Sequence, residues 1–191
     1  MKKTLIIIAF GLTSCNGLTN IDSVENIYYP DSTYFDSSTK FKLDLKNRIK
    51  FNKIEELANI LFQKNLSPYF ELKRGSKISK VIIFRNDHSM IQHRNKLIVR
   101  MDSVYGDKPY PIKDFDIILQ RYADNNGKDY ALPENFDKIF IQIELDSTSN
   151  SENLEELLIG ILDGFDKVNN QGSNKLNLKI GLKYDDLIRI N

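Results

Sequence analysis

The sequence predicts an α+β fold: a two-layer domain with a mostly antiparallel sheet and about two helices packed on one face. Apolar residues alternate in several segments of strand length, two other segments show helical spacing, and runs of strands lie between the helices. No internal repeat and no second linker interrupts the chain, so residues 40–191 are expected to form a single domain.

The domain is expected to begin with a strand and a helix. Odd positions over residues 41–51 are mostly apolar and the positions between them are mostly basic, which is typical of a half-buried strand with a solvated outer face. Asn52 is expected to cap the helix, because Glu55 stands at capping-box spacing. Ser67 and Pro68 lie beyond its expected end.

Short apolar runs in the middle of the chain predict further strands. Residues 81–84 are apolar on both faces, which suggests a central strand, and a charged turn is expected before it at 73–77. Alternation at 97–101 and at 115–119 predicts two more strands. The second of these is expected to turn at 126–127, an Asn-Gly dipeptide that favours hairpins.

The C-terminal part is predicted as strand, helix, strand. Residues 139–145 alternate, and Ser149 and Glu152 have the spacing of a capping box. A helical stripe with offsets of three and four residues covers 154–168. Alternation over 176–184 predicts the last strand.

Two glycines, Gly160 and Gly164, lie one turn apart inside this helix. In an apolar membrane span such a pair favours helix pairing, but several acidic residues on the same helix exclude a span. The glycines are instead expected to let the helix approach the sheet closely.

The first residues have the layout of an export signal. Lys2 and Lys3 precede a compact apolar run at 5–12, less than half of the roughly 20 apolar residues that a membrane span needs. Small residues and the single cysteine of the chain, Cys15, follow. The tetrapeptide at 12–15, Leu-Thr-Ser-Cys, resembles the lipobox of bacterial lipoprotein signal peptides.

This resemblance covers residues 1–15 only. It implies removal of the signal peptide 1–14, attachment of diacylglycerol to the sulfur of Cys15 and acylation of the new amino group, for example by palmitate. Two or more acyl chains hold a protein stably on a bilayer, since each buried methylene contributes about 0.8 kcal/mol. In enteric lipoproteins Asp after the cysteine gives inner-membrane retention; Asn16 stands there, so the outer membrane is favoured.

Residues 15–39 are rich in Ser, Thr, Asn and Asp and are expected to form a lipidated tether. The aromatic residues near its end are expected to dock it onto the domain.

Composition narrows the chemistry of the mature chain. Without Lys2 and Lys3 the 27 basic residues become 25, against 26 acidic residues. This balance gives no basic footprint for nucleic acid. With Cys15 lipidated, no thiol remains for a disulfide or a cysteine-based metal site.

The chain contains two histidines, His88 and His93. Five residues apart, they fall on opposite faces of a strand, so a metal site is not expected. The segment from His88 to Asp102, which includes Arg94 and Arg100, is the candidate centre for a metal-independent hydrolase or a small-ligand protein. No nucleophile elbow, phosphate loop or zinc-protease motif occurs, and no catalytic, cofactor-binding or metal residue is predicted.

The sequence therefore favours a lipid-anchored protein of the bacterial cell envelope that acts as a non-catalytic binding module. A protein partner in the envelope is expected, as for an inhibitor or an immunity-like protein. The hydrolase or small-ligand alternative stays open, and so do the oligomeric state and the identity of the partner.

Overall fold

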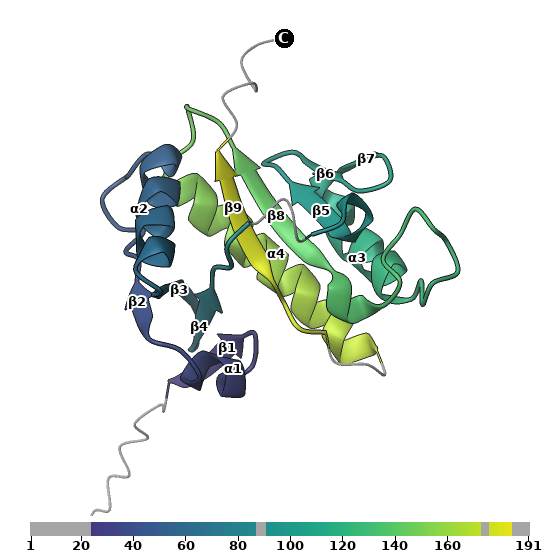
Figure 1. Ribbon diagram of the computed structural model, residues 1–191, viewed down its shortest axis with the longest axis horizontal. Coiled ribbons are helices and arrows are strands. Elements are labelled where there is room, and N and C mark those ends of the chain that lie inside the picture. The colour runs from purple at the N-terminus through teal and green to yellow at the C-terminus, as the bar shows by residue number, and fades with distance from the viewer. Residues whose placement is uncertain (1–23, 87–90, 173–175, 185–191) are drawn as a thin grey trace, which may run out of the picture.

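The computed structural model describes residues 24–86, 91–172 and 176–184 (Figure 1). Within these ranges the chain is an α+β fold with four α-helices and two mixed β-sheets. The α-helices are α1 (Ser32–Asp36), α2 (Phe51–Gln63), α3 (Phe115–Ala123) and α4 (Ser151–Gln171). The strands are β1 (Glu25–Tyr29), β2 (Lys40–Lys42), β3 (Ser67–Arg74), β4 (Lys77–Ile82), β5 (Lys96–Val99), β6 (Ser103–Tyr105), β7 (Pro109–Pro111), β8 (Phe140–Leu145) and β9 (Ile180–Tyr184). Short 3₁₀ helices are η1 (His93–Asn95), η2 (Ile112–Asp114) and η3 (Phe136–Lys138).

The larger sheet has five strands in the order β7-β6-β5-β8-β9. β5, β8 and β9 are mutually parallel, and β6 and β7 extend the sheet as antiparallel neighbours. α4 returns the chain from β8 to β9, which is the crossover that a parallel pair requires. In Figure 1, α4 runs behind β8 and β9, with α2 on one side and α3 on the other.

The smaller sheet has four strands in the order β1-β4-β3-β2. β3 and β4 form an antiparallel hairpin through Gly75, whose φ is +60°, as the turn predicted at 73–77 requires. Beyond β4, Ile83 bridges to Ile180 of β9, and the amide of Phe84 donates to the carbonyl of Ile180 at 2.7 Å. The two sheets meet at this point.

The prediction of a mostly antiparallel sheet is wrong. Among the described residues four strand pairings are parallel and three are antiparallel. Helices explain the difference, because α2 separates β2 from β3 and α4 separates β8 from β9, and such crossovers join parallel strands. The coarser prediction, an α+β fold, is confirmed.

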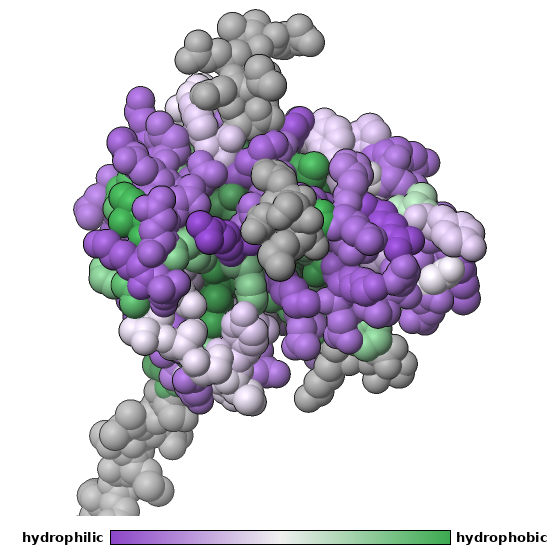
Figure 2. Space-filling model, viewed as in Figure 1, coloured by the Kyte–Doolittle hydropathy of each residue, from purple (hydrophilic) through white to green (hydrophobic). Residues whose placement is uncertain are grey.

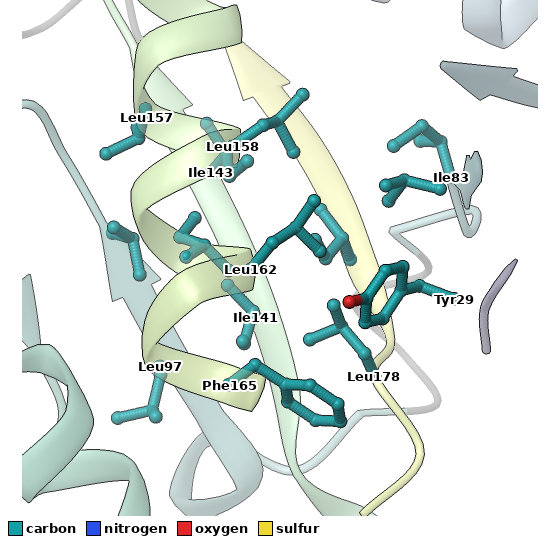
Figure 3. Close-up of a cluster of buried hydrophobic side chains, with 14 of the residues drawn as sticks. Tyr29, Ile83, Leu97, Ile141, Ile143, Leu157, Leu158, Leu162, Phe165 and Leu178 are labelled. Carbon is teal, nitrogen blue, oxygen red and sulfur yellow. The ribbon is translucent and has the colours of Figure 1, made fainter. Parts of the chain in front are cut away.

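The hydrophobic core lies between α4 and both sheets. Figure 3 shows Leu162 and Phe165 of α4 against Ile141 of β8, with Tyr29 of the smaller sheet and Ile83, which follows β4, reaching the same cluster. The buried residues of α4 recur at helical spacing: Ser151, Leu154, Leu157, Leu158, Ile161, Leu162, Phe165 and Val168. This spacing is the stripe that the sequence predicts for the helix.

The C-terminal prediction of strand, helix and strand is confirmed by β8, α4 and β9. The cap lies one residue from the predicted box, because the side chain of Asn150 accepts from the amides of Glu152 and Asn153. The strands predicted at 81–84 and 97–101 correspond to β4 and β5, with boundaries shifted by a few residues.

The strand predicted over 41–51 is largely wrong. Of the predicted residues only Phe41 and Lys42 lie in a strand, β2, and the chain turns further on, where Asn47 and Arg48 have positive φ. α2 begins directly after Lys50, so the cap predicted at Asn52 is wrong as well, although the helix itself is confirmed.

The strand predicted at 115–119 is a helix, α3. Ile117, which alternation places with the buried residues, is 64% exposed. The buried residues follow helical offsets instead: Phe115, Ile118, Leu119, Tyr122 and Ala123. The hairpin predicted at 126–127 is therefore also wrong, and the Asn-Gly dipeptide lies in the loop after α3.

The described part of the expected tether, from Val24 onward, is folded onto the domain. β1 pairs in parallel with β4. The ring of Phe35 in α1 lies against Tyr28 of β1 and Tyr69 of β3, with centroids 4.9 and 5.2 Å apart. The folded unit therefore starts earlier than the boundary expected at residue 40.

A polar contact joins β1 to α4. The buried hydroxyl of Tyr29 donates to the carboxylate of Asp166 at 2.7 Å. Arg74 of β3 donates to Asp166 and to Asp163, each at 2.8 Å. Burial and the hydrogen bond to Asp166 raise the pKa of Tyr29 above its ordinary value, so the hydroxyl keeps its proton and remains a donor.

Candidate functional site

A groove of about 610 Å³ lies between the middle of α4 and the segment that leads from η2 into α3. Most of the side chains that line it are apolar: Met101, Ile112, Phe115, Leu157, Ile159 and Ile161. Met101 is 37% exposed. An apolar hollow of this size on the surface is a candidate binding site.

Two glycines of α4 line this groove, and their surroundings differ. A Cβ at Gly164 would lie 2.7 Å from the ring of Phe115, so this glycine is needed where α3 packs on α4. At Gly160 a Cβ would meet nothing within 4 Å. The expectation that both glycines bring the helix close to the sheet is therefore wrong. Gly164 leaves room for Phe115 of α3, and Gly160 lies on the open floor of the groove.

Charged side chains line the margin of the groove. Lys167 of α4 pairs with Asp116 of α3, and this hydrogen bond lowers the pKa of the Asp116 carboxyl. Asp163 pairs with Arg74. Lys113 and Glu156 also line the groove, and in the described part of the chain neither forms an ion pair. Among the described residues, Lys113 and Glu156 are therefore a cation and an anion without an ion-pair partner beside an apolar floor.

A second polar feature, the Glu144 network, lies in the larger sheet and consists of Asn86, Arg100, Gln142, Glu144 and Lys183. Lys183 and Gln142 donate to one carboxylate oxygen of Glu144 at 2.8 and 3.0 Å. Arg100 donates to the other oxygen at 2.6 and 3.1 Å. Asn86 donates to the side-chain oxygen of Gln142 at 2.7 Å.

The electrostatics of this network hold Glu144 in its charged form. Burial opposes ionisation, but the hydrogen bonds from Lys183 and Arg100 outweigh it and lower the pKa of Glu144. Burial, together with the charge of Lys183, lowers the pKa of the neighbouring Lys96. Because protein donors already occupy both oxygens of Glu144, this carboxylate links β8 and β9 to the end of β5 and is not free to act as a base.

The structure gives the arginines of the candidate centre at 88–102 separate carboxylate partners. Arg94 pairs with Glu134, in the loop that follows α3. Arg100 pairs with Glu144 of β8. The two arginines of this segment are therefore used in two different ion pairs.

The other residues of that segment do not form a cluster among the described residues. His93 is exposed on η1, and Asp102 accepts a hydrogen bond from the adjacent Ser103 at 2.7 Å. His88 and the predicted lipidation site Cys15 lie outside the described residues. Within residues 24–86, 91–172 and 176–184, no group of three or more His, Cys, Asp and Glu side chains is placed to hold a metal ion.

A smaller apolar surface lies on α2. Leu57 and Ile60, three residues apart on the helix, are 44% and 39% exposed. In Figure 2 hydrophilic residues cover most of the visible face, and hydrophobic residues appear on the side of α2. This pair is much smaller than the groove, which remains the main candidate.

Sequence reasoning missed the groove because it assigned residues 115–119 to a strand. The helical recurrence from Phe115 through Ile118 to Tyr122 was the signal that could have identified α3. The network around Glu144 was also missed, although a glutamine and a glutamate inside the apolar run of β8 marked it.

Comparison of the chain with protein-family models, with curated proteins and with solved structures finds no match. None of the described helices combines the length and the apolar character that crossing a membrane demands. The fold and the groove together define an α+β protein with an apolar groove along its longest described helix.

We expect Gly160→Ala and Gly164→Ala to change stability in opposite directions. Gly160→Ala should raise the free energy of unfolding by about 0.5–1 kcal/mol, because alanine is the better helix former and its Cβ meets no atom. Gly164→Ala should lower it, because the new Cβ collides with Phe115. Urea denaturation of both variants measures the difference. A loss of stability at Gly160 would show that its surroundings are not open.

We expect Glu144→Gln to lower the free energy of unfolding by about 2–3 kcal/mol at pH 7, because Arg100 and Lys183 lose their shared partner. The pKa of Glu144 is lower in the folded than in the unfolded chain. The stabilisation that ionised Glu144 contributes is therefore complete above its pKa in the unfolded chain, about 4.3, and is lost as the pH falls through its pKa in the folded chain. Denaturation of wild type and variant at pH 7 and pH 3 should show that the difference between their free energies of unfolding becomes smaller at the lower pH.

The matched control is Glu156→Gln, which removes a surface carboxylate that forms no ion pair with any described residue. It should change stability by no more than about 0.5 kcal/mol at either pH. If the free energy of unfolding of Glu144→Gln differed from that of the wild type by the same amount at both pH values, the ionic explanation would be contradicted.

Proposed function

We propose that the chain is a lipid-anchored protein of the bacterial cell envelope whose domain acts as a non-catalytic binding module. Its binding surface is the groove between α3 and α4, and its ligand is a segment of another protein. The observation that carries this proposal is the groove itself, an open apolar hollow of about 610 Å³ that the described part of the chain leaves uncovered.

A protein segment suits this groove better than a small polar substrate. The floor is apolar, so burial of apolar side chains supplies the favourable free energy. Lys113 and Glu156 stand beside it without ion-pair partners in the described part of the chain, and opposite charges on a ligand complement them. Interfaces of this kind combine an apolar centre with a polar rim.

The lipobox-like residues at 12–15 support the anchor. Nine residue steps separate Cys15 from Val24, where the described chain begins, and at full extension they span at most about 30 Å. A lipid on Cys15 therefore keeps the domain close to the membrane. The partner is a protein that is exposed within this distance of the same surface, with the outer membrane as the favoured location.

The hydrolase or small-ligand alternative centred on 88–102 has no observation in its favour among the described residues. Arg94 and Arg100 bind different carboxylates, and His93 is exposed on the surface. The binding-module proposal uses a surface that is already formed.

We expect Cys15→Ala to abolish labelling of the protein with a radioactive or alkyne-bearing fatty acid and to release it from the membrane fraction. The physical reason is that the substitution removes the sulfur to which the diacylglycerol would be attached. Labelling and fractionation of cells are the measurements, and Gly160→Ala is the control that should keep both the label and the membrane association. Unchanged labelling of Cys15→Ala would refute the anchor.

We expect a photo-crosslinking amino acid in place of Ile159, at the groove, to give a covalent adduct with another protein in cells that make this chain. The same amino acid at Tyr130, which is 88% exposed in the loop after α3 and does not line the groove, is the control. Adducts are detected by a shift in electrophoretic mobility. A yield from Ile159 no higher than that from Tyr130 would contradict the groove as binding surface, whatever the result at Cys15.

A further inference from the structure

We infer that the segment bound in the groove is an amphipathic α-helix of a different protein, and that it crosses α4 at Gly160. This inference rests on the proposed function and adds the conformation and the chemistry of the partner. Three features of the groove support it: the nature of its walls, the open glycine on its floor and the positions of its free charges.

One wall of the groove is the middle of α4, and the other is formed by Met101, η2 and the first turn of α3. The groove residues of α4 lie away from both ends of the helix, so their amides and carbonyls are used inside it and the wall on α4 offers side chains only. An extended segment bound there would leave its own amides and carbonyls without partners on the apolar floor, which is costly. A helix satisfies its backbone internally and needs only side-chain contact.

Gly160 marks the place of closest approach. A Cβ at this position would meet nothing within 4 Å, so packing within the chain does not require a glycine there. Inside a helix, glycine is also less favourable than alanine. A missing side chain lets a second helix come close to the backbone of α4, as Phe115 of α3 does at Gly164 one turn further on.

The groove has the length of a short helix, and two of the charged residues that line it, Lys113 and Glu156, form no ion pair within the described part of the chain. Glu156 and Lys167 of α4 both line it, and their separation along the helix corresponds to about 16 Å, or three turns. The bound helix therefore contacts the groove with apolar residues at i, i+3 or i+4, and i+7. A basic residue on it faces Glu156, and an acidic residue faces Lys113.

The experiment maps the adducts formed by the intact, lipidated protein in cells. The photo-crosslinking amino acid is placed in turn at Met101, Lys113 and Ile159, which line different parts of the groove. Each adduct is digested, and the attachment point on the partner is located by mass spectrometry. The expected result is one partner segment whose attachment points are three, four or seven residues apart.

Gly160→Leu, introduced beside the crosslinker at Ile159, tests the crossing point. The added side chain fills open space, so the domain stays folded, which a thermal melt checks, while the adduct yield should fall about tenfold or more. Gly160→Ala should retain a larger share of the yield, because one methyl group blocks less of the floor. Charge reversal at Glu156 should lower the yield, and reversal of the facing basic residue on the partner should restore it.

Each other outcome has a definite meaning. Attachment points at every second residue would indicate a bound strand and overturn the helix. An adduct with acyl chains would show that the groove binds lipid and not a partner protein. An adduct with a second copy of this chain, whose α2 exposes Leu57 and Ile60, would show that the groove binds that copy instead. An undiminished yield in Gly160→Leu would overturn the crossing point. No adduct at any of the three positions would refute the proposed function itself, not only the helix.

Discussion

The burial of α4 is the constraint on which the rest of the fold depends. This one helix packs against β8 of the larger sheet and meets Tyr29 and Phe70 of the smaller sheet in the same continuous core. Each fully buried leucine or isoleucine contributes about 1.5–3 kcal/mol, whereas a hydrogen bond contributes about 1 kcal/mol net. The apolar stripe of α4 therefore outweighs any single polar contact in holding the two sheets together.

The groove follows from a difference in helix length. α3 has 9 residues and α4 has 21, so α3 covers less than half of the length of α4. Phe115, the first residue of α3, packs against Gly164. The groove follows α4 from Glu156 to Lys167, and its open part lies at Gly160, where an added Cβ would meet no described atom within 4 Å. The apolar residues there belong to the margin of the core, which explains why an apolar hollow lies between charged surface residues.

Elements with a long, regular pattern could be predicted from the sequence, and elements with a short pattern could not. The stripe from Leu154 to Val168 covers four turns and predicts α4 correctly. Three alternating residues at 115–119 fit a strand and the start of a helix equally well, and only Tyr122 further along distinguishes the two.

Burial of polar residues depends on tertiary structure, and the sequence pattern alone does not reveal it. In β8, Gln142 and Glu144 occupy the positions that alternation assigns to solvent, yet both are buried, because Arg100, Lys183 and Asn86 surround them. The groove could not be predicted from local sequence patterns, for a related reason. It lies between segments that are about 40 residues apart in the chain, and only their packing brings them together.

The end of the predicted tether contacts the same helix, α4, that lines the groove. Asp163 lines the groove and binds Arg74, while Arg74 and Tyr29 share the carboxylate of Asp166 less than one turn away. The strand that leads to the predicted anchor is thus fixed to α4 beside the groove, and not at a distant point of the domain. Under the proposed anchoring, a short tether and the attachment of β1 to α4 limit the distance between the groove and the membrane. The groove then meets a partner helix only near the membrane, which makes a membrane-proximal helix a better match than a freely diffusing one.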